Sequence, residues 1–78
     1  MNLELDLHGL TVDEAINKIQ RTIVKNQTCT CIETIHGYRN GCVLKNVLMD
    51  KNNLHNKRVL KTLPHPFNEG RTIIYLKK

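Results

Sequence analysis

The sequence predicts an α/β fold in which two helices cover a four-stranded mixed sheet. Hydrophobic residues alternate with polar ones in short stretches, as in strands, and recur at helical spacing in two longer ones. The expected order β-α-β-α-β-β places the six elements at residues 2–7, 12–25, 28–35, 42–50, 58–63 and 71–76. We expect one domain over residues 1–78, and a chain of this length has a core that suits a shallow surface site better than an enclosed one.

The first strand and the first helix follow from local patterns. Three leucines alternate with polar residues between Leu3 and His8, which is the two-residue period of a strand. Gly9 permits a sharp turn, and Thr11 with Glu14 forms the Thr-x-x-Glu pattern of a helix capping box. The helix then has an apolar face, made of Val12, Ala15, Ile16, Ile19 and Ile23.

The remaining elements define the expected topology. Alternation is imperfect in 28–35, which is typical of an interior strand that is in contact with other residues on both faces. The helix over 42–50 has Asn40 as its expected N-cap. Right-handed β-α-β crossovers make the first three strands parallel, and the short loop before the last strand makes the final pair antiparallel. Two helices can cover one sheet face, so the other face is expected to stay partly open.

Two histidines close the first two strands. His8 and His36 are each followed by a glycine and then by a helix. If the strands are parallel neighbours, both imidazoles lie at one edge of the sheet, where α/β folds commonly place ligands. Asp6 shares a strand face with His8 and could orient a histidine or bind a metal ion. The alternative is that these are ordinary turn histidines beside an ordinary exposed acid.

The loop after His36 has the composition of an anion-binding turn. It opens a helix, whose N-terminal amides favour negative charge. Its glycines let backbone approach a phosphate closely, and nearby cations add attraction. The phosphate-binding residues expected here are Gly37, Tyr38, Arg39, Asn40, Gly41 and Lys45. The alternative is a tight strand-to-helix turn without a ligand.

Charge is unevenly distributed along the chain. The net charge is +5; residues 1–35 carry five acidic and three basic side chains, and residues 36–78 carry nine basic and two acidic ones. A basic half suits a polyanion such as nucleic acid. Lys57, Arg58 and Lys61 either contact phosphates or form a solvated strand edge that discourages aggregation.

Cysteine content and hydropathy indicate a cytoplasmic protein. The three cysteines are an odd number, which does not make a disulfide framework. Cys29 and Cys31 share a strand face in the predicted scheme, and with Cys42 they are expected to be small core residues rather than zinc ligands. We find neither a signal peptide pattern nor an apolar run of about 20 residues, so no membrane partner is expected.

Three motifs resemble those of the Smr (small MutS-related) domain. Residues 5–10, Leu-Asp-Leu-His-Gly-Leu, resemble its Leu-Asp-Leu-His-Gly motif, and residues 35–41 resemble its His-Gly-x-Gly-x-Gly motif. Residues 70–77 are similar to its closing Gly-x-Thr-x-x-x-Leu strand. Arg39 departs from the pattern, because it stands where the family often has its middle glycine. A side chain there either tightens phosphate binding or blocks close approach of the backbone.

The resemblance implies both a fold and a function. The fold is a two-layer sandwich similar to the C-terminal domain of translation initiation factor three. The function is nucleic-acid binding, with DNA-nicking or RNA-cleaving endonuclease activity in several members, which occur as stand-alone proteins or as tails of MutS-like ATPases. As an endonuclease, the chain would use Asp6, His8 and His36, with one imidazole as base and the other as acid. No cofactor is required in this scheme, and a divalent metal ion at Asp6 is the alternative.

A second function of another class uses the same fold. The chain, which we expect to be a monomer under either function, would then be a non-catalytic module that binds DNA, RNA or the ribosome, with its histidines as phosphate contacts. It has only three aromatic residues of the Phe, Trp and Tyr types, Tyr38, Phe67 and Tyr75, so extensive base stacking is not expected. Tyr38 is the exception, because its loop could place it against a base.

Overall fold

The structure, a computed structural model, describes residues 2–37 and 42–77, without the side chain of Cys42. Its elements are β1 (Asn2–Asp6), α1 (Val12–Lys25), β2 (Cys31–Ile35), α2 (Cys42–Leu48), the 3-10 helix η1 (Lys51–Leu54), β3 (Val59–Pro64) and β4 (Arg71–Leu76). The predicted order is confirmed. β2 begins later than expected, α2 ends earlier, and η1 replaces part of an expected loop. The expected N-cap Asn40 lies outside the described residues.

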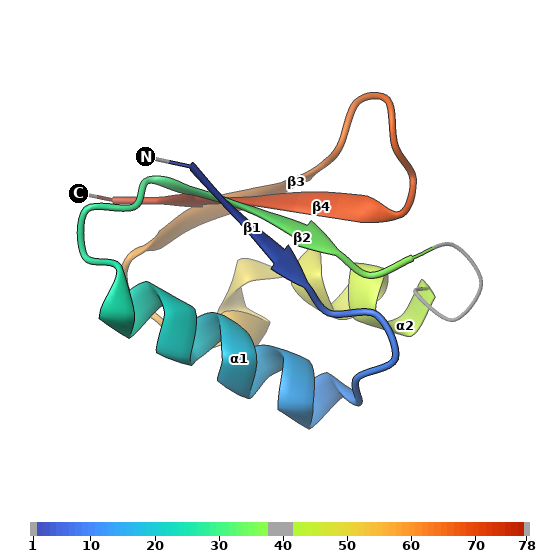
Figure 1. The fold of residues 1–78 in the computed structure, drawn as a ribbon, viewed down its shortest axis with the longest axis horizontal. Coiled ribbons are helices and arrows are strands. Elements are labelled where there is room, and N and C mark those ends of the chain that lie inside the picture. Colours follow the sequence, from blue (N-terminus) through green and yellow to red (C-terminus); the bar gives the residue numbers. More distant parts are fainter. Residues whose placement is uncertain (1, 38–41, 78) are drawn as a thin grey trace.

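The sheet has the strand order β1-β2-β4-β3. β1 and β2 are parallel, and β4 is antiparallel to both of its neighbours. Figure 1 shows both helices on one face of the sheet, which leaves the other face uncovered. The mixed four-stranded sheet, the interior position of β2 and the open face are therefore confirmed, but helices cover β2 on one face and not on both as expected. The carboxyl ends of β1 and β2 meet at one edge because these strands are parallel and adjacent.

The entry into α1 has the geometry that the sequence predicts. The Thr11 hydroxyl accepts a hydrogen bond from the Glu14 amide at 3.2 Å, and the Glu14 carboxylate accepts one from the Thr11 amide at 3.0 Å. Gly9 has a φ of +78°, which most other residues adopt only with strain. This reciprocal cap starts the helix directly after the turn that follows His8.

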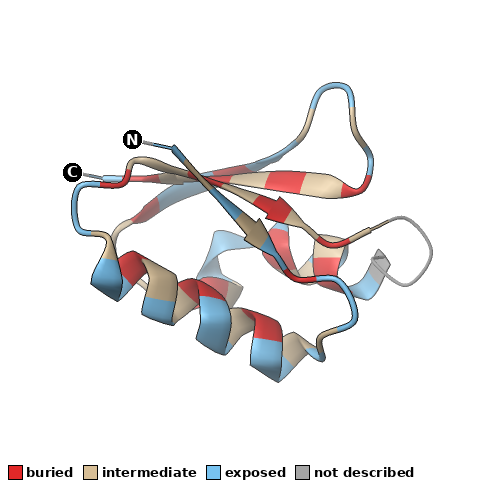
Figure 2. Cartoon of the chain, in the orientation of Figure 1, coloured by how far each residue is buried: buried red, intermediate tan, exposed pale blue. Residues whose placement is uncertain are grey.

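The core lies between the two helices and the covered face of the sheet, as the buried segments in Figure 2 show. Its members are Leu7, Ala15, Ile19, Ile23, Cys29, Ile32, Leu44, Leu48, Leu54, Val59, Ile74 and Leu76. Cys29 is a small core residue as expected, but it does not share a strand face with Cys31. The Cys29 amide bonds to the Asn26 carbonyl in a turn before β2, whereas Cys31 lines a shallow groove on the open face. Among the described residues no helix is long and apolar enough to span a membrane.

Candidate functional site

The ends of β1 and β2 bring His8 and Gly37 side by side. Asp6 is paired with Ile35 in the parallel register, and the Leu7 amide donates to the Ile35 carbonyl at 2.8 Å. A Cβ atom built on Gly37 would lie 4.0 Å from the Cβ of His8. The predicted placement of Asp6, His8 and His36 at one edge of the sheet is therefore confirmed.

Asp6 and His8 form an exposed pair. The His8 Nδ1 atom lies 2.5 Å from Asp6 Oδ1, and the same oxygen accepts the His8 backbone amide at 3.1 Å. The side-chain bond from His8, followed by its backbone bond, lowers the pKa of Asp6. An ionised Asp6 requires the hydrogen on Nδ1, so Nε2 is the nitrogen left to act as a base. The side chains are 72% exposed for His8 and 54% for Asp6, so this nitrogen is accessible to a large substrate.

Lys18 adds positive charge beside this pair. Its Nζ atom donates to the backbone carbonyl of Asp6 at 2.9 Å, and its charge also contributes to lowering the pKa of Asp6. Sequence reasoning placed Lys18 on the outward face of α1 and gave it no role. The contact depends on how α1 packs back beside β1, which no local pattern reveals.

His36 differs from His8 because it is buried, with 3% of its surface exposed. Its Nε2 atom lies 2.9 Å from the Thr72 hydroxyl and its Nδ1 atom 3.1 Å from the Gly37 carbonyl. Burial lowers the pKa of His36, and the nearby charge of Lys45 lowers it further, against the opposing effect of the backbone bonds. The neutral His36 ring has both of its nitrogens in hydrogen bonds within the protein, so its role is structural. The expected pair of two accessible imidazoles is not found.

Thr72 is a site residue to which sequence reasoning gave no role. Besides bonding His36, it accepts a hydrogen bond through its carbonyl from the Thr34 hydroxyl at 2.6 Å. Both threonines are fully buried. The closing Gly-x-Thr motif could have indicated this role. It places a polar residue inside an apolar strand, where a buried hydroxyl needs a hydrogen-bond partner.

Gly37 and Gly70 hold the end of β2 against the start of β4. The Gly70 carbonyl accepts the His36 amide at 2.9 Å and the Gly37 amide at 3.0 Å. A Cβ atom on Gly70 would lie 3.4 Å from the Cα atom of Gly37, so these backbones pack closely. The Gly37 amide is thus bonded within the protein, and the expected close approach of this backbone to a phosphate stays a prediction. Tyr38, Arg39, Asn40 and Gly41 lie outside the described residues.

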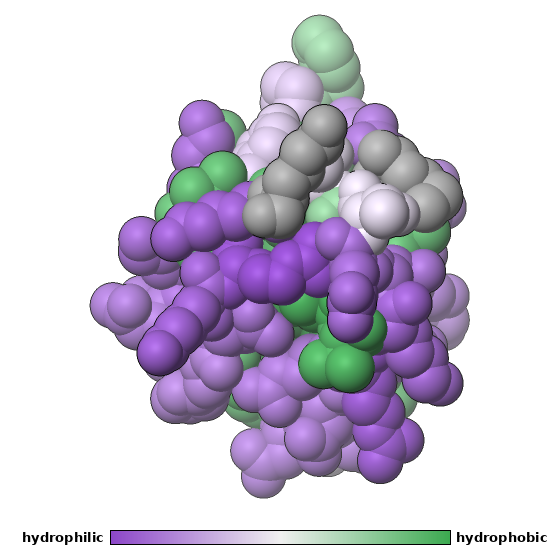
Figure 3. Space-filling view, turned by 90° about the vertical axis from the view of Figure 1, so that its left-hand side faces the viewer, coloured by the Kyte–Doolittle hydropathy of each residue, from purple (hydrophilic) through white to green (hydrophobic). Residues whose placement is uncertain are grey.

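The expected basic stripe lies at the other end of the sheet. Val59 at the start of β3 pairs with Leu76, and Lys61 pairs with Tyr75, with its Nζ atom 5.3 Å from the ring centroid. Lys57 is exposed in the turn before β3. Figure 3 shows this end of the molecule, whose surface is mainly hydrophilic. The stripe is separate from the edge that carries His8.

Arg58 is a structural residue, which corrects its expected role in phosphate binding. Its guanidinium donates to backbone carbonyls at the end of α1 and in the following turn, those of Ile23 at 2.8 Å and of Gln27 and Cys29 at 2.9 Å each. These bonds satisfy carbonyls that the end of a helix leaves without partners. An arginine at a strand start gives no sequence signal for this role.

The donor atoms at the candidate site do not form a metal site by themselves. Asp6 is the carboxylate of the pair, and its Oδ1 atom is already bonded twice to His8. Within residues 2–37 and 42–77, no group of three or more His, Cys, Asp or Glu side chains could hold a metal ion.

The fold and the motifs define a class of protein. The chain belongs to the Smr domain family, whose model matches residues 5–77. Among solved structures it is similar to the Smr domain of Thermus thermophilus MutS2, with a TM-score of 0.71 and 23% sequence identity. That match covers 96% of this chain and 98% of the other, and at this identity it shows the shared fold alone. A search of curated proteins gave no match.

Proposed function

We propose that this Smr domain binds nucleic acid and cleaves its phosphodiester bonds, with Asp6 and His8 as the catalytic pair. The observation that carries the proposal is the exposed His8 imidazole, which Asp6 holds so that Nε2 stays open. The net charge of +5 and membership of the Smr family support nucleic acid as the ligand. In this proposal the chain acts as one cytoplasmic domain.

The chemistry follows from the geometry of the pair. His8 Nε2 removes the proton from the attacking oxygen, and Asp6 stabilises the imidazolium that forms. In RNA the attacking group is the neighbouring 2′-hydroxyl, whereas in DNA a water molecule takes its place. The positive charge of Lys18, beside the pair, balances charge that develops on the phosphate. His36 is bonded on both sides, so the leaving oxygen takes its proton from solvent.

The alternative is a module that binds nucleic acid or the ribosome without cleaving. The burial of His36 favours it, because the site then has one accessible imidazole where sequence reasoning expected an acid and a base. His8 and Lys18 would contact phosphates in this case. Both functions require binding that weakens steeply with salt, since bound phosphates release counterions.

A cleavage assay separates the two functions. End-labelled RNA and DNA of the same sequence are incubated with the wild type, with His8→Ala and with His55→Asn, with and without Mg²⁺. His55 is an exposed control at the end of η1, and its φ of +51° is one that asparagine tolerates. We expect His8→Ala to slow cleavage about 10²- to 10⁴-fold and His55→Asn to leave it unchanged. Binding without cleavage by the wild type supports the alternative.

A further inference from the structure

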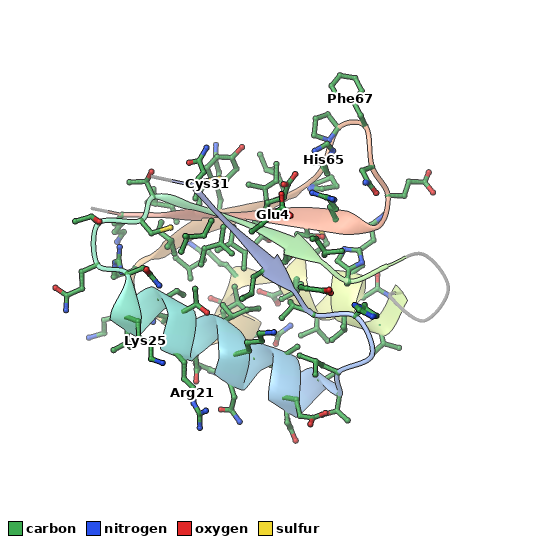
Figure 4. All side chains as sticks on the ribbon, viewed as in Figure 1. Glu4, Arg21, Lys25, Cys31, His65 and Phe67 are labelled. Atoms are coloured by element: carbon green, nitrogen blue, oxygen red, sulfur yellow. The ribbon has the colours of Figure 1, made fainter. Side chains whose placement is uncertain are left out.

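Phe67 is unusually exposed for an aromatic residue. It lies at the tip of the hairpin between β3 and β4, and 94% of its surface is accessible. The other exposed large apolar residues range from Met49 at 41% to Val24 at 66%. Figure 4 shows the Phe67 ring at the far end of the hairpin, pointing away from the sheet. It therefore contributes little to the core, and its apolar surface is available to a partner.

The backbone that carries this ring is well anchored. The Phe67 amide donates to His65 Nδ1 at 3.1 Å, and His65 Nε2 lies 3.0 Å from a carboxylate oxygen of Glu33 on β2. The other oxygen of Glu33 accepts from Arg71 at 3.0 Å. This chain of bonds ties the hairpin tip to the open face of the sheet. Because the backbone beneath the ring is already anchored, little backbone entropy is lost when a ligand binds there.

The base of the same hairpin forms part of the candidate site. Gly70, directly before β4, accepts the backbone amides of His36 and Gly37, and Gly37 is the neighbour of His8. Figure 1 shows the hairpin and the carboxyl ends of β1 and β2 at the same end of the molecule. A nucleic-acid strand that reaches His8 along this edge can extend to Phe67.

We propose that Phe67 stacks on an unpaired base of a nucleic acid whose backbone lies at His8. The inference rests on the proposed function and narrows its substrate to single-stranded RNA or DNA, or to an unpaired loop. A phenylalanine face stacks on any base, whereas bases inside a duplex already stack on their neighbours. Phe67 thus supplies the base contact that sequence reasoning assigned only to Tyr38.

The chain contains no tryptophan, so Phe67→Trp provides a single fluorescent reporter. Val24→Trp is the matched control, because Val24 is also exposed but lies near the far end of α1. Each variant is titrated with a short single strand, with the same strand carrying abasic sites and with a blunt duplex. We expect the intact single strand to quench the fluorescence of the Phe67→Trp variant and the abasic strand to quench it much less. The fluorescence of the Val24→Trp variant should stay unchanged with all three probes.

Binding of the same three probes to Phe67→Ala completes the test. The variant should bind the intact single strand about 5- to 100-fold more weakly than the wild type and the duplex equally well. Equal binding of the single strand, or an equal loss for all three probes, would overturn the inference and leave the proposed function standing. If the fluorescence of the Phe67→Trp variant changes with protein concentration and does not respond to the strand, the ring mediates self-association instead. A wild type that binds none of the probes overturns the proposed function as well.

Discussion

The ends of β1 and β2 have similar sequences and different structures. Each carries an aliphatic residue, a histidine and a glycine, and each glycine has a positive φ, +78° at Gly9 and +83° at Gly37. His8 is nevertheless exposed and bonded to Asp6, whereas His36 is buried and bonded to Thr72. One end exposes an imidazole at the surface, and the other uses an imidazole to hold the fold together.

The difference comes from the register and from the position of each strand. Asp6 pairs with Ile35, so in the continuing register Leu7 lies opposite His36 and His8 lies opposite Gly37. Successive side chains of a strand point to opposite faces, and so the two histidines point to opposite sides. β2 also has β4 as a second neighbour, which supplies Thr72, whereas β1 is at the edge of the sheet. The two His-Gly motifs are offset by one residue in the register, and their histidines therefore have different environments.

The largest expected contrast is in stability. His36→Ala removes a buried ring and leaves the Thr72 hydroxyl without its partner, so it should lower the free energy of unfolding by about 3 kcal/mol. His8→Ala changes an exposed side chain and should lower it by less than about 0.5 kcal/mol. Chemical denaturation of both variants measures the difference. Equal losses would contradict the assignment of His36 as the structural histidine.

Titration of His36 should also make the stability of the protein depend on pH near neutrality. Burial lowers the pKa of His36 in the folded state, so the unfolded chain binds a proton on this residue more readily. The free energy of unfolding should therefore fall as the pH drops below about 6.5, the ordinary value for histidine. The fall should level off below the pKa of the folded state.

His36→Gln is the control for this pH effect. It fills a similar space without titrating, so its stability should decrease less between about pH 7.5 and about pH 5, the range in which histidine ordinarily titrates. The lowered pKa of Asp6 also makes the folded state less stable as the pH falls. This loss occurs below about pH 3.9, the ordinary pKa of aspartate, and so lies outside the pH window of the experiment. Identical pH profiles for the wild type and His36→Gln would refute the assignment.

The smallest expected effect concerns the helix that follows His8. Thr11→Ala removes the hydroxyl that accepts the Glu14 amide, which should lower the free energy of unfolding by about 1 kcal/mol. Thr11→Ser keeps a capping oxygen and serves as the control. A denaturation midpoint that stays unchanged in Thr11→Ala would mean that the cap contributes nothing to stability.

Much of the fold could be predicted from local patterns. The capping box of Thr11 and Glu14 located the start of α1, and the order of strands and helices set the parallel pair that brings His8 and His36 to one edge. Both depend on residues near each other in sequence and on the handedness of β-α-β units. The family resemblance agreed with this pattern and is confirmed by the match over residues 5–77.

The state of each site residue depends on contacts distant in sequence, and these could not be predicted. His36 is bonded to a hydroxyl 36 residues away, and Arg58 donates to carbonyls about 30 residues earlier. The η1 helix and the exposure of Phe67 also result from how the chain packs as a whole. Alternation in β1 and β2 did contain a signal for the opposite orientation of the histidines, because Leu7 and Thr34 face the core.

We expect His8 to react with the substrate and His36 to support the fold. Cleavage by two matched variants distinguishes these roles. Single-turnover cleavage of the same labelled strand is measured for His8→Gln and His36→Gln, and each rate is divided by the folded fraction of that variant. We expect His8→Gln to remain fully folded and to lose about 10²-fold or more in rate, whereas His36→Gln should keep a rate near that of the wild type per folded molecule. A folded His36→Gln variant without cleavage, beside an active His8→Gln, would contradict this expectation.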